Sequence, residues 1–140
     1  MSGAEGPDRA RLVADGVEAG NASFLASFGR VPDNLRLLAE HAPGAFAGYG
    51  LMRDAVMRDG PAAGGALDLR TKELVFCLLD CLVGQTEAAK RHAEAAMAHG
   101  LTLPELAEGL VQVLMVGGIT TWNRSGAEIL RHCAERAARP

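Results

Sequence analysis

The chain has 140 residues, of which 49% are apolar, 22% charged and 4% aromatic. This length predicts one domain spanning 1–140, and the scarcity of large rings favours closely packed helices with an aliphatic core. The net charge of −3 argues against a surface that binds nucleic acid or an anionic membrane.

The N-terminal half is predicted to contain a tail and three helices. Residues 1–8 form a loose tail that lacks the basic and apolar regions of a signal peptide, so a cytoplasmic protein is expected. Apolar residues at helical spacing predict a helix over 9–28. The turn GRVPDN comes next, then a short helix over 33–41 and a helix from Pro43 to about residue 58.

The stretch DGPAAGGA at 59–66 is predicted to be an internal loop. Helix caps mark the C-terminal half of the chain, because Asp68 and Thr102 are N-cap residues and Gly84 is a typical helix end. These signals predict four further helices, over 69–83, 86–98, 103–117 and 119–137. The sequence therefore predicts an all-α fold, an oligomeric bundle of about six to seven helices.

The helix over 69–83 is apolar almost all round, yet it carries two carboxylates. Glu73, Cys77 and Asp80 are spaced i, i+4 and i+7, which places them on one helix face. A buried carboxylate needs a partner or a pocket. Glu73 and Asp80 are therefore either structural hydrogen-bonding groups or candidates for acid–base catalysis, and Cys77 on the same face is a candidate substrate contact.

His92 lies on an alanine-rich face of the next predicted helix, so its side chain is expected to point inward. A single inward histidine is more often a hydrogen-bonded core residue than a catalyst. An inward histidine close to an inward glutamate, however, forms a proton-transfer pair in which the carboxylate fixes the tautomer.

The three cysteines, Cys77, Cys81 and Cys133, are predicted to be reduced thiols packed as small hydrophobic residues. Cys77 and Cys81 are four residues apart within one helix, a frame that does not favour a disulfide. Together with His92 they would give three zinc ligands without a fourth. No metal is expected.

Residues 67–118 resemble the carboxymuconolactone decarboxylase family, which includes the alkylhydroperoxidase D-like proteins. The motifs are LDLRTKEL opening a buried helix, an inward histidine followed by an alanine-rich turn and HGLT, and then PEL, EGL and a double glycine. The resemblance implies an alkylhydroperoxidase D-like helical fold, a small-molecule substrate and a homo-oligomer, either a trimer or a hexamer.

The peroxidase branch of that family carries the pattern E-x11-C-x2-C-x3-H. Counted from Glu73, its cysteine positions fall on Gln85 and Ala88, and its histidine falls on His92. By this resemblance the chain keeps the glutamate and the histidine of the pattern but lacks its two redox cysteines. Peroxide reduction by a cysteine pair therefore has no nucleophile at the two cysteine positions.

The decarboxylase branch implies a reaction without cysteines or cofactors, in which a carboxylated unsaturated lactone loses CO2. The resemblance implies that His92 donates a proton or stabilises the oxyanion and that Glu73 orients it, with Asp80 as a second acid or a substrate contact. Trp122 and Asn123, which come after the double glycine, are further candidates for substrate binding.

The sequence leaves three hypotheses open. The first is a cofactor-independent lyase or isomerase that acts by proton transfer on a small lactone, carbonyl or carboxylate compound. The second is a thiol peroxidase that uses the three cysteines in an unusual way. The third is a non-catalytic helical oligomer or binding module.

Overall fold

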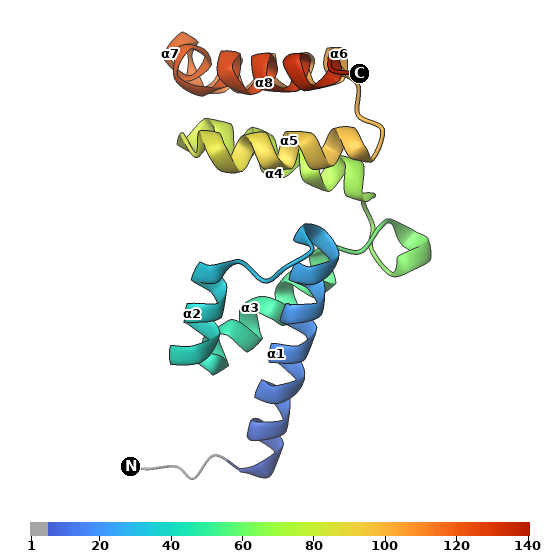
Figure 1. Cartoon of the computed structure of the whole chain (residues 1–140), viewed down its shortest axis with the longest axis vertical. Coiled ribbons are helices and arrows are strands. Elements are labelled where there is room, and N and C mark those ends of the chain that lie inside the picture. The colour runs from blue at the N-terminus through green and yellow to red at the C-terminus, as the bar shows by residue number, and fades with distance from the viewer. Residues whose placement is uncertain (1–5) are drawn as a thin grey trace. The chain divides into compact units, whose positions relative to one another are not determined.

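The computed structural model of the protein describes residues 6–140, so the first five residues of the predicted tail lie outside the described residues. The described part is helical and contains no strand, which confirms the all-α prediction (Figure 1). It forms two compact units, one reaching Arg58 and including Ala63–Gly65, the other made of Asp59–Ala62 and Ala66–Pro140. The single domain and the oligomer stay predictions.

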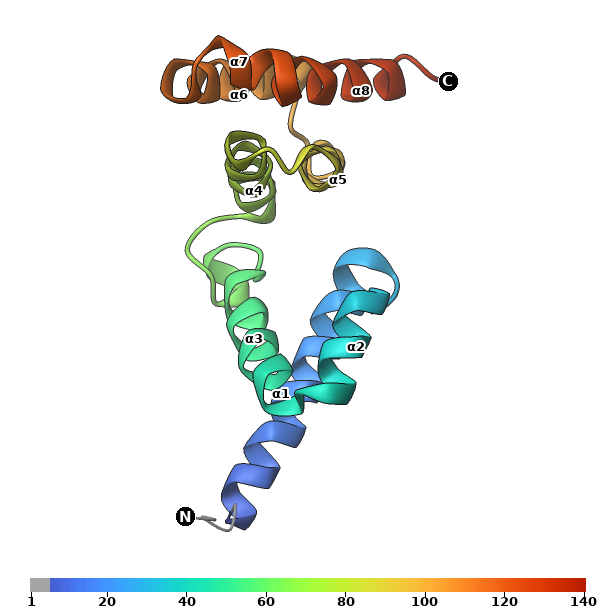
Figure 2. The same ribbon diagram turned by 90° about the vertical axis from the view of Figure 1, so that its left-hand side faces the viewer.

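The first unit contains α1 (Pro7–Phe28), α2 (Asp33–His41) and α3 (Pro43–Val56), close to the three predicted helices. Helix α1 begins inside the predicted tail, because Pro7 occupies its first turn, where a missing N–H costs nothing. Helix α3 crosses α1 (Figure 2), and glycines on both helices let the two backbones approach closely.

An aromatic cluster fills the rest of the first unit. The buried Phe24 ring stacks on the rings of Phe28, Phe46 and Tyr49, with centroid separations of 6.2, 6.2 and 6.1 Å. The guanidinium of Arg53 lies 4.5 Å from the centroid of the Phe24 ring, a cation–π contact. Four of the six aromatic residues of the chain are therefore used in this unit.

The second unit contains α4 (Leu69–Val83), α5 (Thr86–Ala98), α6 (Leu103–Gly117), the short α7 (Ile119–Thr121) and α8 (Ala127–Ala137). Helices α4 and α5 lie side by side in one layer, and α6 and α8 form a second layer against them (Figure 2). Fully buried small side chains dominate the core between these helices: Cys77, Cys81, Ala89, Ala93, Ala96 and Cys133.

The predicted helix caps are confirmed. Asp68 accepts a hydrogen bond from the Thr71 N–H at 2.8 Å. Hydrogen bonds from the side chain and the backbone of Thr71 lower the pKa of the Asp68 carboxyl. Thr102 and Glu105 form a capping box, and the Thr102 N–H bond to Glu105 lowers the pKa of that carboxyl too. Gly84 ends α4 in the left-handed region, at φ +81°.

Two predicted elements differ from the structure. The loop predicted over 59–66 contains one helical turn, Pro61–Ala63. The helix predicted over 119–137 is interrupted by a π-helical segment, Trp122–Gly126, before α8 begins. A Cβ atom at Gly126 would lie 2.8 Å from the Trp122 ring, so the glycine lets the indole lie against this segment.

None of the helices in the part of the chain that the structure describes is both long and apolar enough to cross a bilayer.

The close contact between α1 and α3 predicts opposite effects of two glycine substitutions on α3. A Cβ atom at Gly50 would lie 2.6 Å from Gly20 Cα and 2.8 Å from the Gly16 carbonyl oxygen. Gly50→Ala should therefore reduce the free energy of unfolding by about 1–3 kcal/mol.

Gly48 supplies the matched control, because a Cβ atom there meets no atom within 4 Å. Gly48→Ala should leave stability unchanged or raise it by up to about 1 kcal/mol, through the better helix propensity of alanine. Urea unfolding followed by circular dichroism measures both variants. Equal effects at the two positions would contradict the close packing of α1 on α3.

Candidate functional site

The α4–α5 hairpin determines which side chains of the two helices meet. The turn between the helices is short, with the Gln85 N–H donating to the Asp80 carbonyl at 2.8 Å. Counted outward from this turn, His92 on α5 lies level with Cys77 on α4. Glu73 and Asp80 therefore lie about one helical turn to either side of His92.

Glu73 and His92 form the central contact of the site. The Oε2 atom of Glu73 lies 2.5 Å from Nδ1 of His92. Only 8% of the Glu73 side chain is exposed, so this carboxylate has exchanged water for the imidazole as its hydrogen-bond partner. With the carboxylate as the acceptor, the Nδ1–H donates, and the other ring nitrogen, Nε2, is left for chemistry.

Asp80 faces that second nitrogen. Its Oδ2 atom lies 3.7 Å from Nε2 of His92, beyond the range of a direct hydrogen bond but within that of an ion pair. The side chains of Asp80 and His92 are 27% and 22% exposed, respectively. Nε2 of His92 therefore faces Asp80, the carboxylate that is more exposed to solvent than Glu73.

Phe76 completes the surroundings of His92 and was not among the residues predicted from the sequence. Its ring stacks on the imidazole, with centroids 5.0 Å apart and an interplanar angle of 30°. Phe76 is three residues after Glu73 and four before Asp80, so the helical spacing that joined those two carboxylates also includes it. The spacing places Phe76 on the side of α4 that faces His92, but it does not by itself predict a ring stack.

The cysteines lie within the core. All three are free and buried, and Cys77, predicted as a substrate contact, is fully buried among core side chains. Burial raises the pKa of Cys77 to about 12. Burial also raises the pKa of Cys81 and of Cys133. These thiols remain protonated at neutral pH and are weak nucleophiles.

Trp122 and Asn123, the other predicted substrate contacts, lie in the π-helical segment. The half-buried indole of Trp122 packs against the core of the second unit, whereas Asn123 is exposed. The contacts that surround His92 come from Glu73, Phe76 and Asp80, all on α4.

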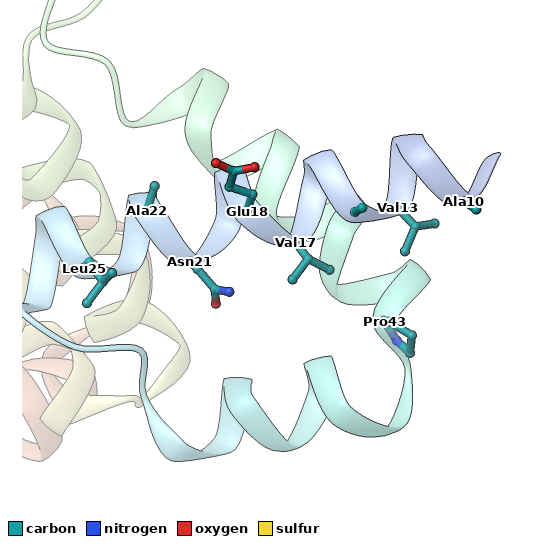
Figure 3. A pocket seen from close by; sticks show the side chains of 9 residues that line it. Ala10, Val13, Val17, Glu18, Asn21, Ala22, Leu25 and Pro43 are labelled. Carbon is teal, nitrogen blue, oxygen red and sulfur yellow. The ribbon is translucent and has the colours of Figure 1, made fainter. Parts of the chain in front are cut away.

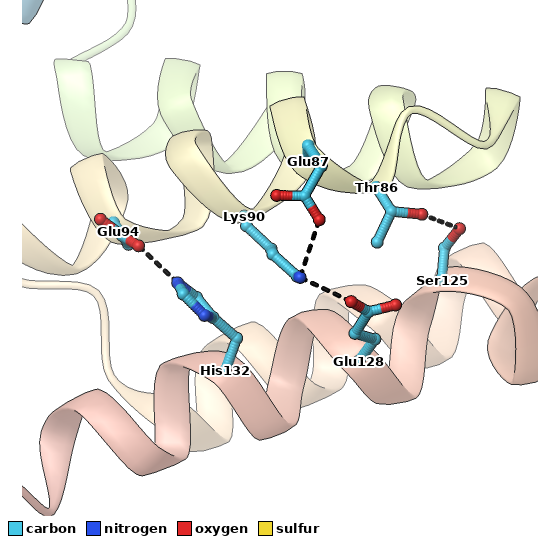
Figure 4. Close-up of polar contacts among 7 residues, drawn as sticks. All are labelled: Thr86, Glu87, Lys90, Glu94, Ser125, Glu128 and His132. Atoms are coloured by element: carbon cyan, nitrogen blue, oxygen red, sulfur yellow. Dashed lines mark hydrogen bonds and ion pairs between the residues drawn. The ribbon is translucent and has the colours of Figure 1, made fainter.

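A separate set of polar contacts ties α5 to α8 and to the π-helical segment that precedes it (Figure 4). Lys90 bonds Glu128 at 2.6 Å and Glu87 at 2.9 Å, and these two bonds raise the pKa of its ammonium. Thr86 and Ser125 share a hydrogen bond of 2.7 Å. These bonds hold the opposite side of α5 while His92 faces α4.

His132 and Glu94 form a second histidine–carboxylate pair between α5 and α8, bonded through Nε2 of His132 (Figure 4). Arg136 also lies within 3.5 Å of Glu94. Within residues 6–140, no second carboxylate pairs with the free ring nitrogen of His132 and no aromatic ring stacks on its imidazole, in contrast to His92. The pair is therefore a natural internal control for Glu73 and His92.

Two hollows lie elsewhere on the described chain. One, of about 670 Å³, is lined by α1 residues and Pro43, mostly apolar, with Glu18 and Asn21 as its polar members (Figure 3). The other, of about 320 Å³, lies between α4 and α6 with Arg70, Glu105 and Glu108 on its lining. Neither hollow includes Glu73, Asp80 or His92.

No group of three or more histidine, cysteine, aspartate or glutamate side chains in the described part of the chain is arranged to hold a metal ion. The arrangement around His92 is therefore best described as a histidine between two carboxylates. Such an arrangement can move a proton to or from a substrate.

Comparison with known proteins identifies a family that this chain matches. The model of the carboxymuconolactone decarboxylase family matches residues 43–132, more than half of the chain. A similar crystal structure is that of a protein from Burkholderia xenovorans LB400 named "putative carboxymuconolactone decarboxylase". The two sequences are 30% identical, and the match covers 89% of this chain and 93% of that protein's chain, with a TM-score of 0.77. No curated protein matches.

The buried thiols generate a labelling prediction. Because burial raises the pKa of Cys77 to about 12, the thiolate that reacts with alkylating reagents is scarce at pH 8. Iodoacetamide at pH 8 should leave all three cysteines unmodified in the folded protein and modify all three in denaturant. Mass spectrometry counts the labels, and rapid labelling of the folded protein would show that a thiol is accessible and ionised.

Proposed function

The chain belongs to the carboxymuconolactone decarboxylase family, and we propose that it is a cofactor-independent lyase or isomerase in which His92 transfers a proton to its substrate. One observation carries this proposal: both ring nitrogens of His92 face carboxylates, at 2.5 Å and 3.7 Å, while the ring is partly exposed. A histidine kept only for packing needs one hydrogen-bond partner.

Glu73 acts as the group that orients the histidine. The buried carboxylate accepts from Nδ1–H, which favours one tautomer of the imidazole. In the low dielectric of the helix pair this hydrogen bond is stronger than it would be in water. Nε2 is then the atom at which the proton is taken up and released.

The reaction that fits best is loss of CO2 from a carboxylated unsaturated lactone. The bond to the departing carboxylate breaks, and its electron pair passes into the conjugated carbonyl system as a dienolate. The protonated Nε2 of His92 then delivers a proton to one carbon of the dienolate, and the neutral imidazole regains a proton from solvent. Carbon, charge and proton balance without an oxidant or a cofactor.

Asp80 has two candidate roles in this scheme. At 3.7 Å from Nε2 it can bond to a substrate group or a water that also contacts the histidine. Its negative charge, however, opposes a substrate that carries two carboxylates. This opposition favours a substrate with a single negative charge, or an isomerisation of a neutral carbonyl compound.

The peroxidase alternative has little support. The sequence contains no C-x-x-C pair, and Gln85 and Ala88 occupy the positions of the redox cysteines. The three thiols present are buried with raised pKa values. The binding-module alternative leaves the second carboxylate at His92 without an explanation.

Replacing the two histidines tests the proposed role of His92. His92→Gln should lower kcat for CO2 release from an unsaturated lactone that carries one carboxylate by about 10²–10⁴-fold, because the proton-transfer group is lost. His132→Gln removes a histidine that also bonds a glutamate, and it should leave turnover unchanged. Full turnover by His92→Gln would refute the assignment of this residue.

Asp80→Asn separates the two roles of Asp80. If the carboxylate only repels an anionic substrate, the variant should show a lower KM with kcat unchanged. We expect instead that kcat falls at least about tenfold, because Nε2 loses the partner at its reactive edge. Steady-state kinetics for substrates with one and with two carboxylates measure both quantities, and an unchanged kcat for both substrates would exclude Asp80 from the chemistry.

A further inference from the structure

Phe76 lies between the two carboxylates of the site and against the face of the histidine. Its ring centroid is 5.0 Å from that of the His92 imidazole, and the two planes are 30° apart. Glu73 and Asp80 contact the edge of the imidazole at Nδ1 and Nε2. Three residues of α4 thus contact the imidazole: the two carboxylates lie at its edge, and Phe76 lies over its face.

The aromatic character of this position is unusual for its surroundings. The other large apolar residues of α4 are all aliphatic, namely Leu69, Leu74, Val75, Leu78, Leu79, Leu82 and Val83. The remaining phenylalanines of the chain, Phe24, Phe28 and Phe46, belong to the first unit. The one phenylalanine of the second unit is therefore the residue that stacks on the histidine.

The two carboxylates alone leave the orientation of the imidazole open. Rotation about the Cβ–Cγ bond of His92 would turn either ring nitrogen away from its partner. A flat ring against the imidazole face opposes this rotation, and an aliphatic side chain of similar volume gives no comparable planar surface.

We propose that Phe76 is a positioning residue that holds the His92 imidazole in the orientation joining Nδ1 to Glu73 and leaving Nε2 at the Asp80 side. The importance of this orientation for turnover rests on the proposed function, in which Nε2 transfers the proton. The orientation itself is a property of the free protein, and it can be measured without a substrate.

The test uses the ¹⁵N chemical shifts of the His92 ring nitrogens in the full-length protein labelled with ¹⁵N-histidine. The chain has four histidines, and the spectrum of His92→Gln assigns the signals of His92. The shifts report which nitrogen carries the proton, at a pH where the ring is neutral. Phe76→Leu removes the flat ring, Phe76→Tyr keeps it, and Phe28→Leu removes a stacked ring from the first unit as a control.

In the wild-type protein and in Phe76→Tyr, the Nδ1–H tautomer of His92 should dominate. In Phe76→Leu, the ratio of the Nδ1–H to the Nε2–H tautomer should fall by about two- to tenfold, the range expected for loss of one aromatic stack. Phe28→Leu should leave the His92 shifts unchanged. The kcat of Phe76→Leu should fall in parallel with the tautomer ratio, while KM changes little.

Unchanged His92 shifts in a folded Phe76→Leu protein would overturn the proposal, since they would show that Phe76 only fills space. If circular dichroism shows that the leucine variant does not fold, the wild-type spectrum decides. An equal mixture of tautomers there, or no ring-current displacement of the His92 ring protons, would overturn it as well. A positive shift result together with full activity of His92→Gln would instead refute the proposed function and leave the positioning role intact.

Discussion

A carboxylate taken out of water must find a donor, and the second unit of this protein is built around one such pairing. Glu73 is almost fully buried and bonds Nδ1 of His92 at 2.5 Å. A hydrogen bond to a charged group contributes about 1.5–3 kcal/mol, and a buried carboxylate left without one costs at least as much. This single constraint determines which sides of α4 and α5 face each other, and it favours the Nδ1–H tautomer of the histidine.

The packing of the helix pair maintains the distance on which this hydrogen bond depends. Small buried residues, including Cys77 on α4 and the alanines Ala89 and Ala93 on α5, let the two helices lie close together. On the far side, Lys90 ties α5 to α8 through its bond to Glu128. Because both sides of α5 are held, His92 has little freedom to move away from α4. A preorganised group of this kind loses little entropy during proton transfer.

Helical periodicity and capping were enough to predict much of the site from the sequence. The spacing of Glu73 and Asp80, the caps at Asp68 and Gly84, and the inward direction of His92 all depend on local geometry, and the structure brings these three site residues together. Sequence reasoning missed the stack of Phe76, because the apolar pattern of a buried helix places an aromatic residue in the core just as it places an aliphatic one.

Other features of the fold could be recognised only from the three-dimensional packing. The π-helical segment beginning at Trp122 arises where the indole lies against Gly126, a contact between residues four apart that no propensity scale records. Likewise, the burial of Cys77 depends on the neighbouring helices of the second unit covering it. The prediction of a packed thiol is confirmed, whereas the substrate contact suggested by the polar face of α4 is wrong.

A crystal structure with the enol-lactone product bound tests the central claim most directly, because it locates the reacting carbon relative to His92. We predict that a ligand atom lies within about 3.2 Å of Nε2 of His92, on the side of Asp80, while Nδ1 keeps its bond to Glu73. A ligand bound away from His92, for example in the hollow between α4 and α6 near Arg70, would contradict the proposed role of the histidine.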